Sequence, residues 1–187
     1  MEPHKYDRRG ANDEGKFAQA LYDLSCQGAG RKYREANIKE DCEGVDRYVG
    51  GKAVDVKGRK FRIPPNTCWV ETSASGKPHG TGWVYKPKWI AQLMVFEQDH
   101  YITNCIFGEY HTSDLLEVMN KKVDYKSTAS RGELYKLYTR WTDGKHRGTM
   151  TVVTYEDLQS LKSFSVLPVP RCKWDEARRI YGLLGIK

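Results

Sequence analysis

The stretch GVDRYVGGKAVDVKGRK, residues 44–60, carries the clearest structural pattern in the chain. Two runs of alternating residues flank Gly50-Gly51, and a Gly-Gly pair at this spacing predicts a two-residue β-hairpin turn. Counting outward from the turn places Asp46 opposite Asp55. Directly opposed residues have Cβ atoms about 4.5–5.5 Å apart, so two carboxylates there repel each other. A hairpin with this register therefore needs a cation between its aspartates.

The residues around this pair indicate which cation it would hold. Carboxylate oxygens on a rigid strand pair suit a hard divalent cation, Mg²⁺ or Mn²⁺. Lys57 follows Asp55 by two residues and so shares its face of the strand. An ammonium there could hold an attacking water or stabilise charge developing on a phosphate. The alternative is that Asp46 faces solvent and Asp55 and Lys57 form a surface ion pair, but the register and the shared face favour a metal site.

Two further acids could complete the site. Glu14 lies three residues before Phe17, on the apolar stripe of a helix predicted to begin at Asn12. A glutamate on an inward helix face needs a partner, although the helix dipole alone also favours an acid there. Glu71 alternates with Trp69 in CWVETS, a predicted third strand from residue 68, and could line the same face. We expect Glu14 to act with the catalytic residues and Glu71 with the metal ligands.

Composition restricts the class of protein. The chain has 187 residues, a formal net charge of +7 and a pI of about 9.1, which fits a polyanionic partner such as nucleic acid. No apolar run approaches the length of a membrane span, and the first residues contain no secretory signal. The five cysteines show no zinc spacing, so we expect reduced thiols in the cytoplasm, or in the host cytoplasm if the protein is viral.

The remaining patterns predict one α/β or α+β domain around a mixed sheet flanked by helices. Apolar strands are expected at 89–97 and 101–110, a helix from residue 112, and a helix at the C-terminal end. The core is expected over residues 12–120, with a basic extension over 121–187. Four basic side chains near the hairpin and in the glycine-rich loop 75–82 are expected to contact nucleic acid: Arg59, Lys60, Lys77 and His79.

With Asp46, Asp55-Val56-Lys57 and Glu14 in place, the sequence resembles the PD-(D/E)XK nuclease superfamily. The core of that superfamily is a helix, a three-stranded meander, a second helix and a further strand. The resemblance covers about residues 12–110, and Val45 stands where the family motif has proline. It implies a restriction-endonuclease-like core and Mg²⁺-dependent hydrolysis of phosphodiester bonds, most simply in DNA. The small size and basic tail are similar to resolvase-like or restriction-like nucleases of phages and prokaryotes.

Two other functions compete with an active nuclease. One is a nucleic-acid-binding protein of the same fold without catalysis, and the other is an unrelated enzyme or interaction domain in which the aspartates are incidental. Retention of both aspartates and the lysine favours the nuclease. The sequence leaves open whether the substrate is DNA or RNA, which strand structure it has, and whether a homodimer forms on symmetric DNA.

Overall fold

The protein is described here by a computed structural model that covers residues 9–59, 63–74, 77–86, 88–129, 133–142, 145–181 and 185–186. These residues form two mixed β-sheets flanked by helices, so the predicted mixed α/β (α+β) class is confirmed. In the described ranges, no helix is long and apolar enough to cross a membrane. Free thiols are found at all five cysteines.

The first helix, α1 (Arg9–Gly28), begins three residues before the predicted Asn12 and ends where glycine appears. Its buried face carries Ala18, Leu21, Tyr22 and Cys26, at the three- and four-residue steps that a helix places on one side. Gly30 then adopts a positive φ of +67°, which glycine reaches without a steric penalty, and the chain turns into the first strand.

The larger sheet has the order β1-β2-β3-β5-β6-β10, with β11 (Gly185–Ile186) paired to β6. It begins with an antiparallel meander of β1 (Tyr33–Glu35), β2 (Arg47–Val49) and β3 (Lys52–Lys57). A short helix, α2 (Ile38–Cys42), joins β1 to β2 behind a capping box in which Asn37 and Glu40 bond each other's backbone. Gly50 and Gly51 have φ values of +55° and +80°, as a two-residue hairpin turn requires.

Beyond the meander, β5 (Trp89–Gln98) pairs parallel to β3. After a turn at Asp99-His100 the chain returns as β6 (Tyr101–His111), antiparallel to β5, so the two strands expected at 89–97 and 101–110 are confirmed. The strand β10 (Ser165–Pro168) completes the far edge.

The smaller sheet has the order β4-β9-β8-β7. Its strands are β4 (Thr67–Ser73), β9 (Lys145–Thr154), β8 (Lys136–Thr142) and β7 (Asp124–Thr128). The sequence predicted residues 68–73 as the third strand of the hairpin's own sheet, and this is wrong. Strand β4 pairs with β9 instead, because alternation identifies a strand without identifying its neighbour.

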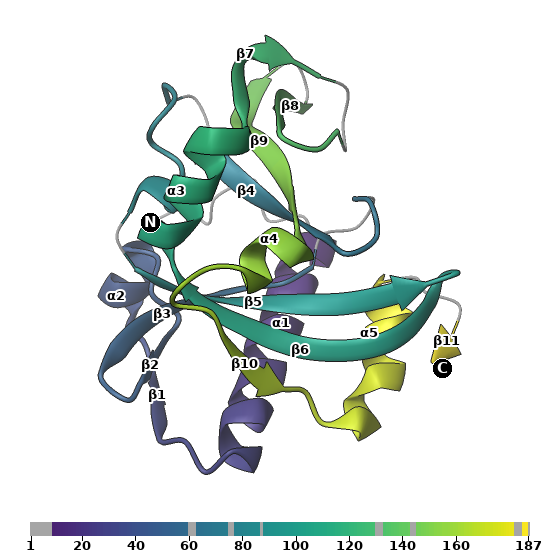
Figure 1. Ribbon diagram of the computed structural model, residues 1–187. Helices are drawn as coiled ribbons and strands as arrows, with labels where there is room; N and C mark the ends of the chain where they lie inside the picture. Colours follow the sequence, from purple (N-terminus) through teal and green to yellow (C-terminus); the bar gives the residue numbers. More distant parts are fainter. Residues whose placement is uncertain are drawn as a thin grey trace.

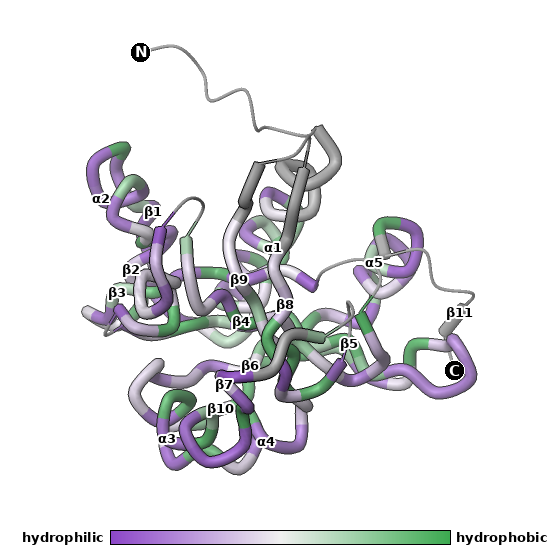
Figure 2. The backbone as a smooth tube through the Cα atoms, turned by 90° about the horizontal axis from the view of Figure 1, so that it is seen from above, coloured by the Kyte–Doolittle hydropathy of each residue, from purple (hydrophilic) through white to green (hydrophobic). Residues whose placement is uncertain are grey.

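Other elements lie on the two faces of the larger sheet (Figure 1), and each face carries an apolar cluster. Helices α1 and α5 (Trp174–Tyr181) cover one face, through Leu21, Tyr22 and Ala177. The smaller sheet, α3 (Thr112–Lys122) and α4 (Tyr155–Gln159) cover the other, through residues such as Val70 and Leu115. Figure 2 shows the hydrophobic segments gathered toward the middle of the molecule, where the strands of the two sheets overlap.

The chain after residue 121 is part of both layers. Strand β9 lies in the interior of the smaller sheet, and β10 pairs with β6 of the larger one. Two 3₁₀ turns, η1 (Trp83–Tyr85) and η2 (Arg171–Lys173), connect the remaining segments. The expected basic extension therefore contributes strands to both sheets.

Candidate active site

The predicted hairpin register is observed from Arg47 to Val54, but the predicted pair of Asp46 and Asp55 is not part of the ladder. Val49 pairs with Lys52, and Arg47 pairs with Val54. One residue before β2, Asp46 leaves the regular ladder: its backbone N–H donates to the carbonyl of Val54 at 2.9 Å. Its side chain then takes over the pairing, because Oδ2 accepts the backbone N–H of Val56 at 2.6 Å. The carboxylate of Asp46 is thus fixed against β3 beside Asp55.

Asp46 is also held from the helix. Gln19 of α1 donates its amide Nε2–H to Asp46 Oδ1 at 2.8 Å. Burial, followed by the neighbouring charge of Asp55, raises the pKa of the Asp46 carboxyl to about 6. The bond from Val56 and the charge of Lys57 oppose that rise in the pKa. This is the electrostatic signature of two carboxylates that share one location.

Asp55 lies in the interior, with 3% of its surface exposed. Lys57 places its Nζ 2.6 Å from Asp55 Oδ1, and a second lysine, Lys88, forms an ion pair with Oδ2. Each carboxylate oxygen of Asp55 therefore contacts its own ammonium group. A surface ion pair, the alternative reading of Asp55 and Lys57, does not fit this degree of burial.

Lys88 was not predicted from the sequence. It immediately precedes β5, whose first residue, Trp89, pairs with Val54 in the parallel ladder. Its Nζ also donates to the carbonyl of Gly44 at 3.1 Å, and Gly44 has a φ of +82° that orients this carbonyl. Burial lowers the pKa of Lys88, while Asp55 acts in the opposite direction. Only the parallel pairing of β3 with β5 brings this lysine to the aspartate.

Lys57 is the accessible member of the group, with 31% of its side chain exposed. Its Nζ lies 5.5 Å from the ring centroid of Trp83, the first residue of η1. Gly82, just before it, passes so close to β4 that an added Cβ would lie 2.0 Å from the carbonyl oxygen of Glu71. That close approach positions the indole at the open side of the site.

Glu71 itself points elsewhere. Cys68 and Val70 of β4 pack toward the larger sheet, so by alternation Glu71 shares the opposite face with Trp69. Trp69 packs edge-on against Tyr138, with ring centroids 5.0 Å apart, on the outer side of the smaller sheet. The expectation that Glu71 lines the face of the aspartates is therefore not supported, because β4 belongs to another sheet.

The other expected residues are distributed as follows. The guanidinium of Arg59 forms an ion pair with Glu97 in the interior, which argues against the nucleic-acid contact expected for it. Lys77 and His79 lie in the exposed loop, and His79 Nε2 is 3.0 Å from the hydroxyl of Tyr85. Lys60 and the side chain of Glu14 lie outside the described residues, so their roles stay predictions.

A divalent cation such as Mg²⁺ prefers hard oxygen ligands. Asp46 and Asp55 supply hard oxygens, and the charge of Asp55 is the second cause, after burial, of the raised pKa of Asp46. No cluster of three or more histidine, cysteine or acidic side chains suited to a metal occurs in the described part of the chain. Two carboxylates are ligands of the kind that Mg²⁺ or Mn²⁺ takes, and a cation placed between them would have to replace an ammonium group on Asp55.

Comparison with known proteins adds no relative. No protein family model, curated protein or solved structure matches this chain.

Proposed function

We propose that this protein is a Mg²⁺-dependent nuclease of the PD-(D/E)XK type that hydrolyses phosphodiester bonds in DNA. One observation carries the proposal: the hairpin, α1 and β5 together hold Asp46, Asp55 and Lys57 as one charged group. Burying two neighbouring carboxylates is costly, and a structural role alone would be served as well by apolar residues. Clusters of perturbed charges of this kind are typical of functional sites.

The order of the elements supports the same proposal. The nuclease core expected from the resemblance is a helix, a three-stranded meander, a helix and a further strand. Here α1 precedes the meander β1-β2-β3, and β5 is the further strand beside β3. The chain between β3 and β5 forms β4 and η1 where that core has its second helix, which is the main departure.

The residues divide the chemistry between them. Asp46 and Asp55 would hold the cation, which when bound supplies a water of lowered pKa and neutralises charge on the phosphate. Lys57, partly exposed beside Trp83, would hold the attacking water or the phosphate if a cation took its place on Asp55. Lys88 stays buried and keeps Asp55 oriented. We place this activity in the cytoplasm, with a homodimer as the form suited to symmetric DNA.

A second function is favoured by one specific observation. Both oxygens of Asp55 already contact ammonium groups, as they would in a nucleic-acid-binding protein of this fold that has lost catalysis. The two functions differ in whether a divalent cation can replace Lys57 on Asp55.

Calorimetric titration separates these functions. We expect wild type to bind Mg²⁺ or Mn²⁺ and Asp46→Asn to lose most of that affinity. Asp175→Asn, at an exposed position of α5, is the matched control because it removes the same charge from another element. Equal affinity in all three proteins would remove the metal site, and with it the nuclease proposal. Ca²⁺ should bind without supporting cleavage.

A further inference from the structure

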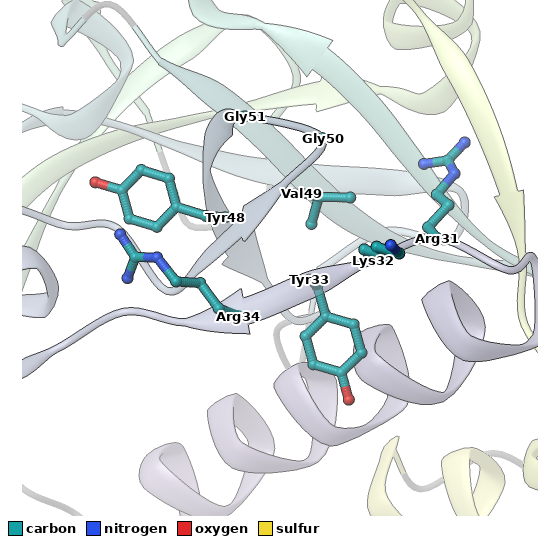
Figure 3. Close-up of a pocket in the computed structure, with 8 residues that line it drawn as sticks. All are labelled: Arg31, Lys32, Tyr33, Arg34, Tyr48, Val49, Gly50 and Gly51. Carbon is teal, nitrogen blue, oxygen red and sulfur yellow. The ribbon is translucent and has the colours of Figure 1, made fainter.

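A shallow groove of about 520 Å³ lies along β1 and the Gly50-Gly51 turn, beyond the aspartates (Figure 3). Its lining contains three cations, Arg31, Lys32 and Arg34, and no acidic residue. The glycine turn leaves the end of the groove without side chains that would obstruct a ligand. This composition suits an anionic ligand with flat rings, and none of the residues predicted to contact nucleic acid lies in it.

The guanidinium of Arg34 is held as a fixed plane. Its central carbon lies 3.9 Å from the centroid of the Tyr48 ring, and Figure 3 shows the two side chains on the same side of the hairpin. Two hydrogen bonds of 2.8 Å to Glu40 fix the guanidinium nitrogens. More than half of the Arg34 side chain, 55%, stays exposed. A guanidinium held in this way can stack a second planar group on its open side.

The strand register connects this plane to the aspartates. Arg34 pairs with Tyr48, and Tyr48 pairs with Ala53, forming one row across three strands. Asp55 lies two residues beyond Ala53, so it shares their face at roughly 7 Å along the strand. Lys32 precedes Arg34 by two residues and lies about as far again in the opposite direction. Arg34 and Tyr48, which line the groove, therefore lie on the same face of the sheet as Asp55.

The charges in the groove are unequally compensated. Arg31 forms an ion pair of 2.6 Å with Glu109, and Arg34 is paired with Glu40. Lys32, the residue before β1, is exposed and lines the same groove as Arg34. Lys32 is thus positioned for phosphate, while Arg34 offers a plane to a base.

We propose that this groove binds a single-stranded segment of nucleic acid next to the phosphate to be cut, with an unpaired base stacked on Arg34 and the backbone against Lys32. The inference rests on the proposed function for the position of the cut, but not for binding itself. Single-stranded nucleic acid is required because a base in a duplex is already stacked on its neighbours and cannot cover the guanidinium.

The test measures binding without metal, so that it does not depend on cleavage. Fluorescence anisotropy in chelator would use a labelled single-stranded deoxyoligonucleotide of about 12 nucleotides, a length within common site sizes, and its duplex. Arg34→Lys keeps the charge but loses the plane, and Lys32→Gln loses the charge. Lys162→Gln, which alters an exposed lysine after α4, is the matched control. Thermal melting confirms that each variant is folded.

We expect Arg34→Lys to weaken single-strand binding about tenfold, the range of one lost base stack, and to leave duplex binding within about twofold. Lys32→Gln should reduce the salt dependence of single-strand binding by about 0.7 in slope, the value for one phosphate contact. If both variants bind the single strand as tightly as the Lys162→Gln control does, the proposed binding in the groove is refuted. It is also refuted if Arg34→Lys loses as much affinity for the duplex as for the single strand.

Failure of this inference and failure of the proposed function are distinguishable. If wild type cleaves nucleic acid in Mg²⁺ but Arg34→Lys and Lys32→Gln bind normally, the groove is refuted and the nuclease stands. If the variants lose binding as expected and wild type does not cleave, single-strand binding in the groove is supported and the nuclease proposal is refuted.

Discussion

Replacing Lys88 with methionine tests the contact that sequence patterns did not reveal. The substitution removes the ammonium but keeps an unbranched side chain of similar length. In the folded protein, Asp55 would lose its partner at Oδ2, and the carbonyl of Gly44 would lose a donor. Lys57, whose Nζ lies 2.6 Å from Oδ1, would remain as the ion-pair partner of Asp55.

The expected magnitude follows from burial. Removing one partner of a buried ion pair costs about 3–5 kcal/mol, because the remaining charge is left without compensation. Lys57 still compensates part of the charge on Asp55, so we expect the lower end, about 3 kcal/mol. In a chain of this size each kcal/mol lowers the melting temperature by about 2–4 °C, so Lys88→Met should melt about 6–12 °C below wild type. Lys57→Met, at an accessible position, should lose less.

A double-mutant cycle gives the decisive assay. Thermal melting would compare Lys88→Met, Asp55→Asn and the variant that carries both changes. If Lys88 and Asp55 interact as the structure has them, the loss in the double variant is clearly smaller than the sum of the single losses. Additive losses, or a melting temperature of Lys88→Met within about a degree of wild type, would refute this reasoning.

Three further predictions concern the hairpin and the loop beside it. Between pH 3.8, the ordinary pKa of an aspartate, and about pH 6, Asp46 is deprotonated in the unfolded chain but still protonated in the folded one, so wild type should lose stability relative to Asp46→Asn as pH rises through this window and level off above it. A difference in melting temperature that does not change with pH would contradict the raised pKa of Asp46. Gly82→Ala should destabilise the protein by about 3 kcal/mol or more, because the added Cβ would lie 2.0 Å from a backbone oxygen. The control Gly28→Ala, whose Cβ would have nothing within 4 Å, should melt like wild type, and equal melting temperatures of the two variants would disprove the clash. Lys57→Ala should slow cleavage by about 10²–10³ while binding nucleic acid in Ca²⁺ nearly as wild type does, and unchanged cleavage would show that Lys57 has no catalytic role.

The hairpin could be predicted from the sequence because its information is local. Gly50 and Gly51 supply the positive φ values of the turn, and the turn fixes the register that brings Asp46 and Asp55 together. The two-residue spacing then places Lys57 on the face of Asp55 by the geometry of a strand alone.

The rest of the site depends on pairings between distant segments. Alternation in CWVETS predicts a strand, but it cannot show that β4 joins β9 rather than β3, so Glu71 was expected on the wrong sheet. Strands β3 and β5 pair in parallel although β4 and η1 lie between them in the sequence, and only this pairing places Lys88 at Asp55. Burial of Arg59 likewise depends on Glu97, far along the chain.

The segment 121–148 contains strands that its sequence pattern did not reveal. Its lysines, arginines and aromatics read as a polar, basic stretch, yet it forms β7, β8 and the beginning of β9. Tyr138 is buried against Trp69, so this aromatic belongs to the packing of the smaller sheet. Basic residues on the outer positions of strands are hard to distinguish from a loop when the partner strands are unknown.

Cleavage of nucleic acid by wild type in Mg²⁺, with and without chelator, tests the central claim most directly. Labelled single-stranded, double-stranded and branched DNA and RNA would be incubated with wild type, Asp46→Asn, Lys57→Ala and the Asp175→Asn control. A nuclease centred on Asp46 and Asp55 predicts cleavage that requires Mg²⁺ or Mn²⁺, stops on chelation, survives in the control and is largely lost in the other two variants. Absence of cleavage of every substrate by wild type, or cleavage by Asp46→Asn and Lys57→Ala at the wild-type rate, would contradict it.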